Sequence, residues 1–446
     1  MISKHLCRLI LLVCFTAFKT SYSQEVIDIG LQRELFVDHH LVDSINGLAF
    51  KLNKPQEVQS TNIPNGYYQT IIKTDSLYRI YFRDILAFYK GEGYDGNLGE
   101  ITKSAISNDG YNWQEEPTGL NDSITNYISY DPPFNHNFTP FKDTNPNATH
   151  QYKALSGTRA SGGLYYFYSD DGITFEKYQE APIIKNNPEY YAFDSQNVAF
   201  WSEFENQYVC YFRRSINGLR SFARTTSPDF IHWSEPVNIF PNLPGEHLYT
   251  SGTQPYFRAP HLYIALATRF FPDRSNSTDI VFMNSRNGLT FNRTFKEAFI
   301  RPGLMPERWG NRSNNVTLNV VPLDTMYMGI FARNSLYKIR MDGFASVSSN
   351  FEEGFFITKP LRLKGNNLEI NYSTTAGGYV FIEILDAANN PIPNVTDAIS
   401  EKLIGDEISR TVTWKNLADL SSLKGRTIKL KITLKEADLY ALKFNE

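Results

Sequence analysis

Polar side chains are unusually dense between residues 245 and 269, where they could carry chemistry on a charged substrate. This stretch contains Glu246, His247, Tyr249, Gln254, Arg258, His261 and Arg269, and further on follow Arg301, Arg308, Trp309, Arg312 and Asn315. Arginine grips carboxylates and sulfates through paired hydrogen bonds, and histidine moves protons near neutral pH. The pattern therefore indicates a site for an anionic ligand.

Each of these residues also has a structural interpretation. Arg258 lies in an apolar run, which suits an arginine paired with an acid of a neighbouring segment as well as one that binds substrate. For Arg301 and Arg308, substrate binding is the favoured interpretation. His247 follows Glu246 in a Pro-Gly loop; loops at the mouth of a domain carry function, but an exposed loop histidine explains the position equally well.

The elements that must position these residues follow from a short turn that recurs along the chain. The copies are Ser107–Trp113, Ser169–Phe175, Ser227–Trp233 and Ser285–Phe291, at steps of 62, 58 and 58 residues, and a weaker fifth copy, Asp342-Gly343, follows after 55. Asp or Asn binds backbone N–H groups, Gly takes a positive φ, and an aromatic ring returns to the packed face. A repeat of about 60 residues, rich in Tyr, Phe, Val and Ile, is typical of a propeller blade. The sequence thus predicts an all-β protein with a five-bladed β-propeller.

The two ends of the chain predict a signal and a second domain. Lys4 and Arg8 precede a short apolar run, and small residues precede a cut at Gln24, which is typical of a secretory signal over residues 1–23. The propeller is expected over residues 24–347. Apolar and polar residues alternate in segments of 352–446, which predicts an accessory β-sandwich. We therefore expect an exported protein, periplasmic or secreted, with no membrane span.

Composition argues against several classes of function. The formal net charge is −3 and no basic block occurs, so nucleic acid is not an expected partner. No residues have the spacing of a zinc site and no glycine-rich loop suits a nucleotide, so we expect no cofactor and no metal ligands, although Asp and Asn oxygens are compatible with a structural Ca²⁺ ion. Cys210 lies in an apolar run and is interpreted as a buried strand residue. We expect a monomer.

Several features together carry a resemblance to known proteins. They are the five blades, the S-x-D-G-x-x-W turns, the C-terminal β-sandwich and the segments Glu34–Asp38, Phe193–Asn197, Gln254–His261 and Phe299–Gly303. The chain resembles the propeller hydrolases of glycoside hydrolase families 32, 43 and 68, and more closely a group of exported bacterial proteins described as glycosidase-like. The resemblance covers almost the whole mature chain. It implies a central funnel in which blades one to three each contribute a carboxylate.

Under this resemblance the three carboxylates are Asp38, Asp143 and Asp194. Asp38 would be the nucleophile or base, Asp143 the stabiliser, and Asp194, or nearby Glu189, the acid, because glycoside hydrolysis needs two carboxyl groups with different pKa values. The chain lacks the Asn-Asp-Pro-Asn-Gly and Glu-Cys motifs of those families, and its third blade carries Asp in place of the usual Glu. Hydrolysis of acidic cell-wall oligosaccharides, with uronic acids or sulfates, is favoured by a narrow margin.

Two alternatives stay open. A β-eliminating lyase or dehydratase removes the C5 proton of a uronic acid, so it needs a His or Tyr base and a cation or amide that neutralises the developing enolate. His247, His261, Tyr249, Arg258 and Asn197 fit these roles. A non-catalytic glycan-binding propeller would use the same groups without chemistry.

Overall fold

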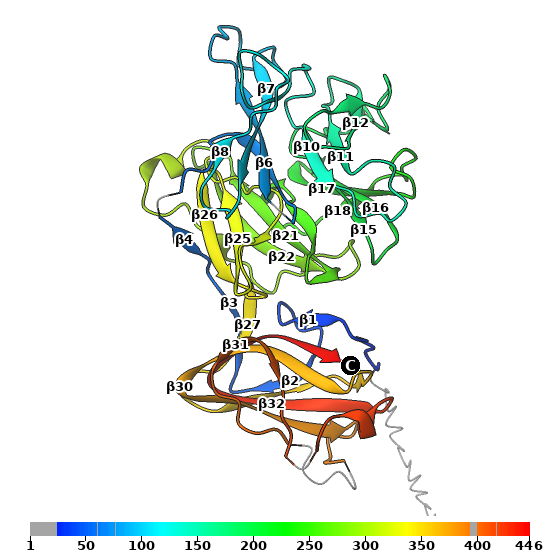
Figure 1. Ribbon diagram of the computed structural model, residues 1–446, viewed down its shortest axis with the longest axis vertical. Helices are drawn as coiled ribbons and strands as arrows, with labels where there is room; N and C mark the ends of the chain where they lie inside the picture. The colour runs from blue at the N-terminus through cyan, green and yellow to red at the C-terminus, as the bar shows by residue number, and fades with distance from the viewer. Residues whose placement is uncertain (1–24, 60, 76, 393–398, 416) are drawn as a thin grey trace, which may run out of the picture.

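The computed structural model describes residues 25–446 except 60, 76, 393–398 and 416. The propeller lies at one end of the long axis and a second β domain at the other (Figure 1). In the part of the chain described, two short 3-10 helices, η1 (Pro306–Trp309) and η2 (Ser421–Leu423), accompany the strands. None of the described helices is long and apolar enough to cross a membrane. The predicted signal over residues 1–23 lies outside the described residues.

Five antiparallel sheets form the blades, as predicted. Blade one consists of β5 (Tyr67–Lys73), β6 (Tyr78–Ile85), β7 (Glu100–Ser107), β8 (Gln114–Glu115) and β9 (Tyr127–Ser129). Blade two consists of β10 (Thr139–Lys142), β11 (Tyr152–Ser156), β12 (Gly163–Ser169), β13 (Glu176–Lys177) and β14 (Ile184–Lys185), and blade three of β15 (Val198–Ser202), β16 (Gln207–Ile216), β17 (Leu219–Ser227) and β18 (Val237–Ile239). Blade four consists of β19 (His247–Thr250), β20 (Thr253–Tyr256), β21 (Ala259–Phe271), β22 (Ser277–Ser285) and β23 (Ala298–Ile300).

Blade five is completed by a strand from the other end of the chain. It contains β24 (Val321–Pro322), β25 (Tyr327–Ala332) and β26 (Ser335–Arg340), and its fourth strand is β4 (Gln56–Val58). Leu336 of β26 pairs with Val58 of β4. The ring of blades is therefore closed by pairing between residues 278 to 282 positions apart.

The recurring turn forms as its residues predict. Asp109 Oδ1 accepts hydrogen bonds from the backbone N–H groups of Tyr111 and Asn112, both at 2.8 Å. Gly110 has a φ of 77°, a conformation that glycine adopts without strain. Trp113 folds back into the core, where it is 5% exposed and donates from Nε1 to the Gly110 carbonyl. Corresponding backbone bonds occur at Asp171, Asp229 and Asn287.

The second β domain draws its strands from both ends of the chain. Among the described residues its nine strands are β1 (Arg33–Leu35), β2 (Val42–Asn46), β3 (Ala49–Leu52), β27 (Ala345–Ser348), β28 (Gly354–Thr358), β29 (Leu361–Arg362), β30 (Asn367–Asp386), β31 (Asp406–Thr411) and β32 (Thr427–Asn445). The propeller was expected to begin at residue 24. In the structure, β1 to β3 pair with strands of the second domain, and the propeller strands begin with β4.

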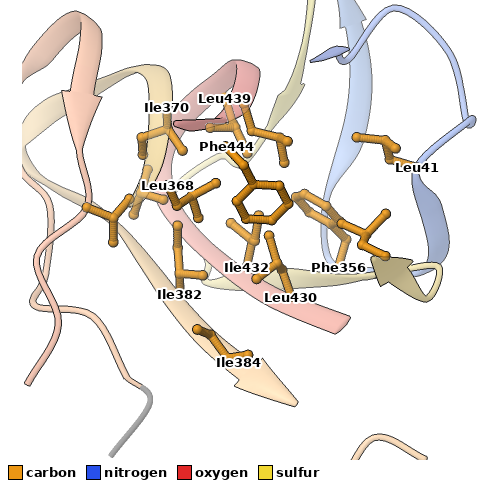
Figure 2. Packing of buried hydrophobic residues seen from close by; sticks show 14 of the residues in the cluster. Leu41, Phe356, Leu368, Ile370, Ile382, Ile384, Leu430, Ile432, Leu439 and Phe444 are labelled. Carbon is orange, nitrogen blue, oxygen red and sulfur yellow. The ribbon is translucent and has the colours of Figure 1, made fainter. Parts of the chain in front are cut away.

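Alternating apolar residues of the two longest strands build the core of this domain. Ile370 and Ile382 of β30 and Ile432 of β32 are fully buried, and Phe356 of β28 and Leu41 pack against them (Figure 2). Because side chains point to opposite faces at every second position, the period-two pattern places these residues on one side. The pairings connect all nine strands into one sheet around this core.

Asp342 joins the two domains, and here the fifth copy of the turn departs from the others. Asp342 itself takes the positive φ, 62°, and its side chain is fully buried. Its carboxylate accepts hydrogen bonds from Arg258 at 3.0 Å, from the Tyr256 hydroxyl at 2.6 Å and from Asn371 of β30 at 3.1 Å. Arg33 of β1 forms a further ion pair with it. In this fifth turn the Asp342 side chain therefore connects the propeller with the second domain.

Candidate active site

One side chain from the start of each blade meets at one end of the propeller axis. The inner strands contact one another around this axis; for example, Leu318 donates to the Gln69 carbonyl at 2.9 Å. The five converging residues, one from each of blades one to five in chain order, are Tyr68, His136, Asp194, Tyr249 and Arg312. We call these five residues the funnel cluster.

Close contacts connect the funnel cluster around the axis. The Tyr68 and Tyr249 hydroxyls are 3.3 Å apart, and Arg312 Nη1 donates to the Tyr249 hydroxyl at 3.1 Å. The rings of Tyr68 and His136 meet edge to face with centroids 5.5 Å apart. His136 Nε2 lies 3.9 Å from Asp194 Oδ1. The cluster therefore places two phenols, an imidazole, a carboxylate and a guanidinium in mutual reach.

The backbone around the cluster is strained in three blades. Tyr68, Phe193 and Arg312 have φ values of 47°, 67° and 53°, although none of them is glycine. Side chains rarely adopt this region, and such residues occur preferentially where a functional group must be held in a fixed direction. The strain supports a functional role for this end of the propeller.

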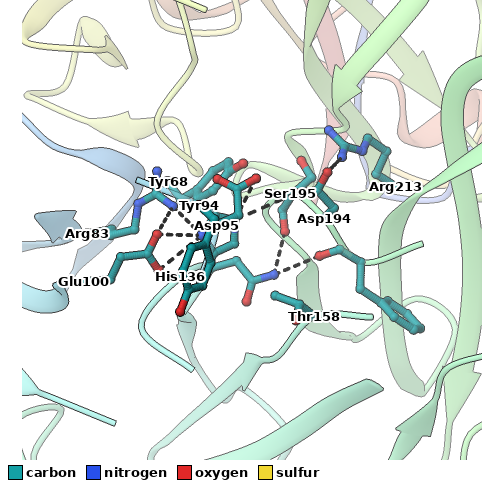
Figure 3. A network of polar contacts seen from close by, with 12 residues as sticks. Tyr68, Arg83, Tyr94, Asp95, Glu100, His136, Thr158, Asp194, Ser195 and Arg213 are labelled. Atoms are coloured by element: carbon teal, nitrogen blue, oxygen red, sulfur yellow. Dashed lines mark hydrogen bonds and ion pairs between the residues drawn. The ribbon is translucent and has the colours of Figure 1, made fainter. Parts of the chain in front are cut away.

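Glu100 and Arg83 of blade one orient His136. The imidazole is fully buried, and its Nδ1 lies 3.0 and 3.2 Å from the two Glu100 carboxylate oxygens. Arg83 contacts Nδ1 and donates to Glu100 at 2.9 Å. Nδ1 therefore lies between an acceptor, the Glu100 carboxylate, and a donor, the Arg83 guanidinium. The other ring nitrogen, Nε2, has no hydrogen-bond partner among the described residues. Figure 3 shows His136 beside Glu100 and Arg83.

Asp194 uses its two oxygens differently. Oδ2 accepts from the Tyr191 hydroxyl at 2.8 Å and pairs with Arg213, whereas Oδ1 faces His136. Burial raises the pKa of Asp194, but Arg213 and the Tyr191 hydrogen bond more than offset it, so the pKa lies below its ordinary value. Asp194 is therefore an anion at neutral pH. Asp95 approaches from the segment before β7, with Oδ2 4.0 Å from His136 Nε2.

The two tyrosines of the cluster have opposite pKa shifts. Burial raises the pKa of Tyr249, but Arg213, the Tyr68 hydroxyl and Arg312 outweigh burial, so the pKa lies below the ordinary value. The Arg213 guanidinium lies over the Tyr249 ring, 4.5 Å from its centroid. Burial and the neighbouring Tyr249 raise the pKa of Tyr68 well above its ordinary value. Tyr249 is thus prepared to lose a proton and Tyr68 to keep one.

A cavity of about 140 Å³ opens beside the cluster. Its lining includes Tyr67, Tyr68, Gln196, Thr250 and Arg312. Tyr67 is 56% exposed, so an aromatic face is available at the rim for a sugar ring. The lining combines tyrosine rings with amides, the guanidiniums of Arg312 and Arg333, and the Glu307 carboxylate, which suits a polar ligand with hydroxyl groups.

Of the predicted catalytic residues, Asp194 lies in the funnel cluster and the other two carboxylates do not. Asp38 follows β1 of the second domain, where Asn284 donates to it at 2.5 Å and Arg286 at 3.2 Å. Asp143 lies at the far end of β10, fully buried against Lys153. The expectation that the three carboxylates come from inner strands and share one funnel is wrong.

Most of the other predicted residues have structural partners outside the cluster. Arg258 binds Asp342, His261 binds Glu34 at 2.9 Å, Arg308 binds Glu57, and Glu246 binds Arg293 at 2.8 Å. These contacts correspond to the ion-pair interpretation. Arg301 is exposed.

Three predicted residues lie in or near the cluster. Tyr249 belongs to the cluster. Asn197 donates to the carbonyls of Phe193 and Ser195, the two neighbours of Asp194 in the chain, and so holds the backbone that carries Asp194. His247, two residues from Tyr249 on β19, accepts from the Arg220 backbone at 3.2 Å; burial and Arg220 lower its pKa. His247 is therefore a neutral neighbour of the site rather than a member of it.

Sequence reasoning missed His136, Tyr68, Arg213 and Glu100. A signal for His136 exists in the repeat. His136 and Asp194 each lie 35 residues before the Asp of the following turn, Asp171 and Asp229, so they occupy equivalent positions in blades two and three. Asp95, His136 and Asp194 also form a group whose ligand atoms are close enough to hold one metal ion. The spacing of these three residues in the sequence does not indicate a metal site.

Comparisons with known proteins find similar solved structures only. No family model and no curated protein match the sequence. A β-1,2-mannobiose phosphorylase from Listeria innocua is similar over 66% of this chain and 98% of its own, with 9% identity and a TM-score of 0.47. A thermostable family-43 glycoside hydrolase matches 65% of this chain and 96% of its own, with 13% identity and a TM-score of 0.41. A fructofuranosidase from Schwanniomyces occidentalis matches 95% and 100%, with 11% identity and a TM-score of 0.39. The reaction therefore has to follow from the site's own residues.

Proposed function

We propose that the protein is a carbohydrate-active enzyme that performs β-elimination on uronic-acid oligosaccharides, with Tyr249 as the base. The observation that carries this proposal is the setting of Tyr249: its hydroxyl accepts from Arg312 and lies 3.3 Å from the Tyr68 hydroxyl, and the Arg213 guanidinium lies over its ring. Cations around a buried phenol favour its phenolate. Export, a monomeric state and an acidic cell-wall polysaccharide as the source of the substrate belong to the same proposal.

The proposed reaction uses groups with matching protonation states. The Tyr249 phenolate removes the C5 proton, and the C–H electron pair forms the C4–C5 double bond as the bond from C4 to its oxygen breaks. Tyr68, with its raised pKa, donates a proton to that leaving oxygen. Arg312 and Arg213 stabilise the charge that develops on the uronate carboxylate. A glycosidic leaving oxygen gives a lyase, and a free hydroxyl gives a dehydratase.

Hydrolysis is the second candidate, and one observation favours it. The carboxylates of Asp95 and Asp194 each have an oxygen within 4.8 Å of the other. Retaining glycosidases hold two carboxyl groups about 5–5.5 Å apart. In this reaction the ionised Asp194 would be the nucleophile and the exposed Asp95 the acid. Elimination is preferred because three cationic or phenolic groups of the cluster have no role in the hydrolytic scheme.

Mass spectrometry of acidic plant and algal oligosaccharides, before and after incubation with the mature protein, tests the proposal. Cleavage that leaves an unsaturated uronate, or loss of one water without cleavage, supports elimination. Cleavage with addition of one water establishes hydrolysis and refutes the proposed reaction. Binding without conversion across the panel would leave a glycan-binding propeller.

A further inference from the structure

A buried nitrogen faces two carboxylates inside the funnel. His136 Nε2 is fully buried and has no hydrogen-bond partner among the described residues. It lies 3.9 Å from Asp194 Oδ1 and 4.0 Å from Asp95 Oδ2, and the three donor atoms are within 4.8 Å of one another. A buried polar atom normally has a partner, so an orphan directed at two acids indicates that something is bound between them.

The surroundings prepare each donor for a metal ion. The Glu100 carboxylate contacts His136 Nδ1, the ring nitrogen that does not face Asp95 and Asp194; a carboxylate behind a ligating histidine is a common outer contact of metal sites. Arg213 and Tyr191 occupy only Oδ2 of Asp194, so Oδ1 remains directed at the site. Two carboxylates this close repel each other unless a cation lies between them.

We infer that Asp95, His136 and Asp194 bind one divalent transition-metal ion of the Mn²⁺ or Zn²⁺ class. Imidazole suits transition metals, whereas Mg²⁺ and Ca²⁺ prefer sites made entirely of oxygen. Three protein ligands leave coordination positions for an exogenous group. If the proposed elimination is right, on which this last step rests, those positions take the uronate carboxylate beside Tyr249.

Metal binding by the full mature chain tests the inference directly. The protein is stripped with a chelator and titrated separately with Mn²⁺, Zn²⁺ and Ca²⁺ by calorimetry, with elemental analysis after dialysis. We expect one equivalent of Mn²⁺ or Zn²⁺. Asp95→Asn and His136→Gln should each weaken binding at least about tenfold, since loss of an outer-shell partner alone costs 10- to 100-fold. Asp95 is half exposed, so its variant should fold normally, which thermal melting checks.

A surface histidine–aspartate pair supplies the matched control. His232 lies 2.7 Å from Asp229 in an exposed turn, so His232→Gln removes an imidazole of similar chemistry outside the funnel and should leave metal binding unchanged. Absence of stoichiometric binding, preference for Ca²⁺, or unchanged affinity in Asp95→Asn and His136→Gln would overturn the inference. Tyr249→Phe should keep the metal. If the protein binds metal as expected but forms no unsaturated product, the inferred metal site stands and only the proposed function is refuted.

Discussion

Removal of one oxygen, in Tyr249→Phe, tests the proposed elimination most directly. The phenylalanine ring keeps the contacts of Tyr249 with the Arg213 guanidinium and with Phe270, whose ring centroid is 5.6 Å away. The hydroxyl hydrogen bonds to Arg312 and Tyr68 are lost. A hydrogen bond to a charged group contributes about 1.5–3 kcal/mol, and Arg312 is only partly buried, so we expect a loss of about 1.5 kcal/mol in the free energy of unfolding.

The expected effect on catalysis is much larger than the effect on stability. A general base contributes about 10²–10⁴-fold, which corresponds to about 2.7–5.4 kcal/mol in the activation barrier. The variant should therefore be folded and nearly inactive. The assay is the ultraviolet absorbance of the conjugated unsaturated uronate, measured on an oligosaccharide that the wild-type protein converts.

The pH profile separates a base from a merely structural tyrosine. Because the pKa of Tyr249 lies below its ordinary value of 10.0, kcat/KM should fall as the pH drops through that lowered pKa and the phenolate is lost. The residual activity of Tyr249→Phe should lack this limb. Tyr263→Phe is the matched control, since that buried hydroxyl donates to Glu205 and hydrogen bonds with the Ser202 hydroxyl, away from the funnel. A Tyr249→Phe variant with kcat within about threefold of wild type would refute the reasoning.

Four further predictions concern stability and reactivity. Asp342→Ala should cost about 3–5 kcal/mol, because it removes the ion-pair partner of Arg258, one of the two acids paired with the buried Arg33, and the acceptor of the Tyr256 hydroxyl. Asp406→Ala, at an exposed ion pair, should cost at most about 1 kcal/mol in chemical denaturation. Asp38→Asn should lower the melting temperature and leave kcat/KM unchanged, because the residue contacts Asn284 and Arg286 rather than the funnel. Burial raises the pKa of Cys210, so a thiol reagent should label it only after unfolding. The backbone N–H of Asn112 and further local hydrogen bonds lower the pKa of Asp109 to about 2; its contribution to stability should be complete above its ordinary pKa of 3.8 and disappear as the pH falls toward 2, a dependence that Asp109→Asn abolishes.

Each of these predictions has a contrary outcome. Equal losses for the two Asp→Ala variants would mean that the burial of Asp342 has no energetic consequence. Loss of activity without loss of stability in Asp38→Asn would restore the hydrolase arrangement. Rapid labelling of Cys210 in the folded protein, or an acid unfolding curve that Asp109→Asn leaves unchanged, would contradict the environments described for these two side chains.

The propeller could be predicted because its signal is local and repeated. Asp109, Gly110 and Trp113 fold their turn through contacts within a few residues, and the fixed spacing of the copies carries the rest. The position of Asp38 could not be predicted in the same way. Leu35, Phe36 and Val37 form a continuous apolar run, which reads the same in an inner blade strand as in a strand of another domain.

Only part of the funnel cluster could be predicted from the sequence, for a different reason. Asp194 and Tyr249 attract notice by type and neighbourhood, whereas His136 gains its chemistry from Glu100 and Asp95, which come from other segments. A lone histidine is most often structural, and only its position relative to the repeated turn distinguishes this one. The ion pairs of Arg258 with Asp342 and of His261 with Glu34 join segments far apart in the sequence, so these partners could not be named in advance.

The exchange of strands between the chain ends has a consequence for the order of folding. Strands β1 to β4 are synthesised first, but their partners β26, β27, β28 and β32 come last. Neither the ring of blades nor the second domain can be completed until nearly the whole chain is present. Contacts between distant residues make folding slow, because the entropy of closing large loops must be overcome first. A truncation before β32 would therefore leave β1 and β28 as open edges prone to association, instead of removing a dispensable appendage.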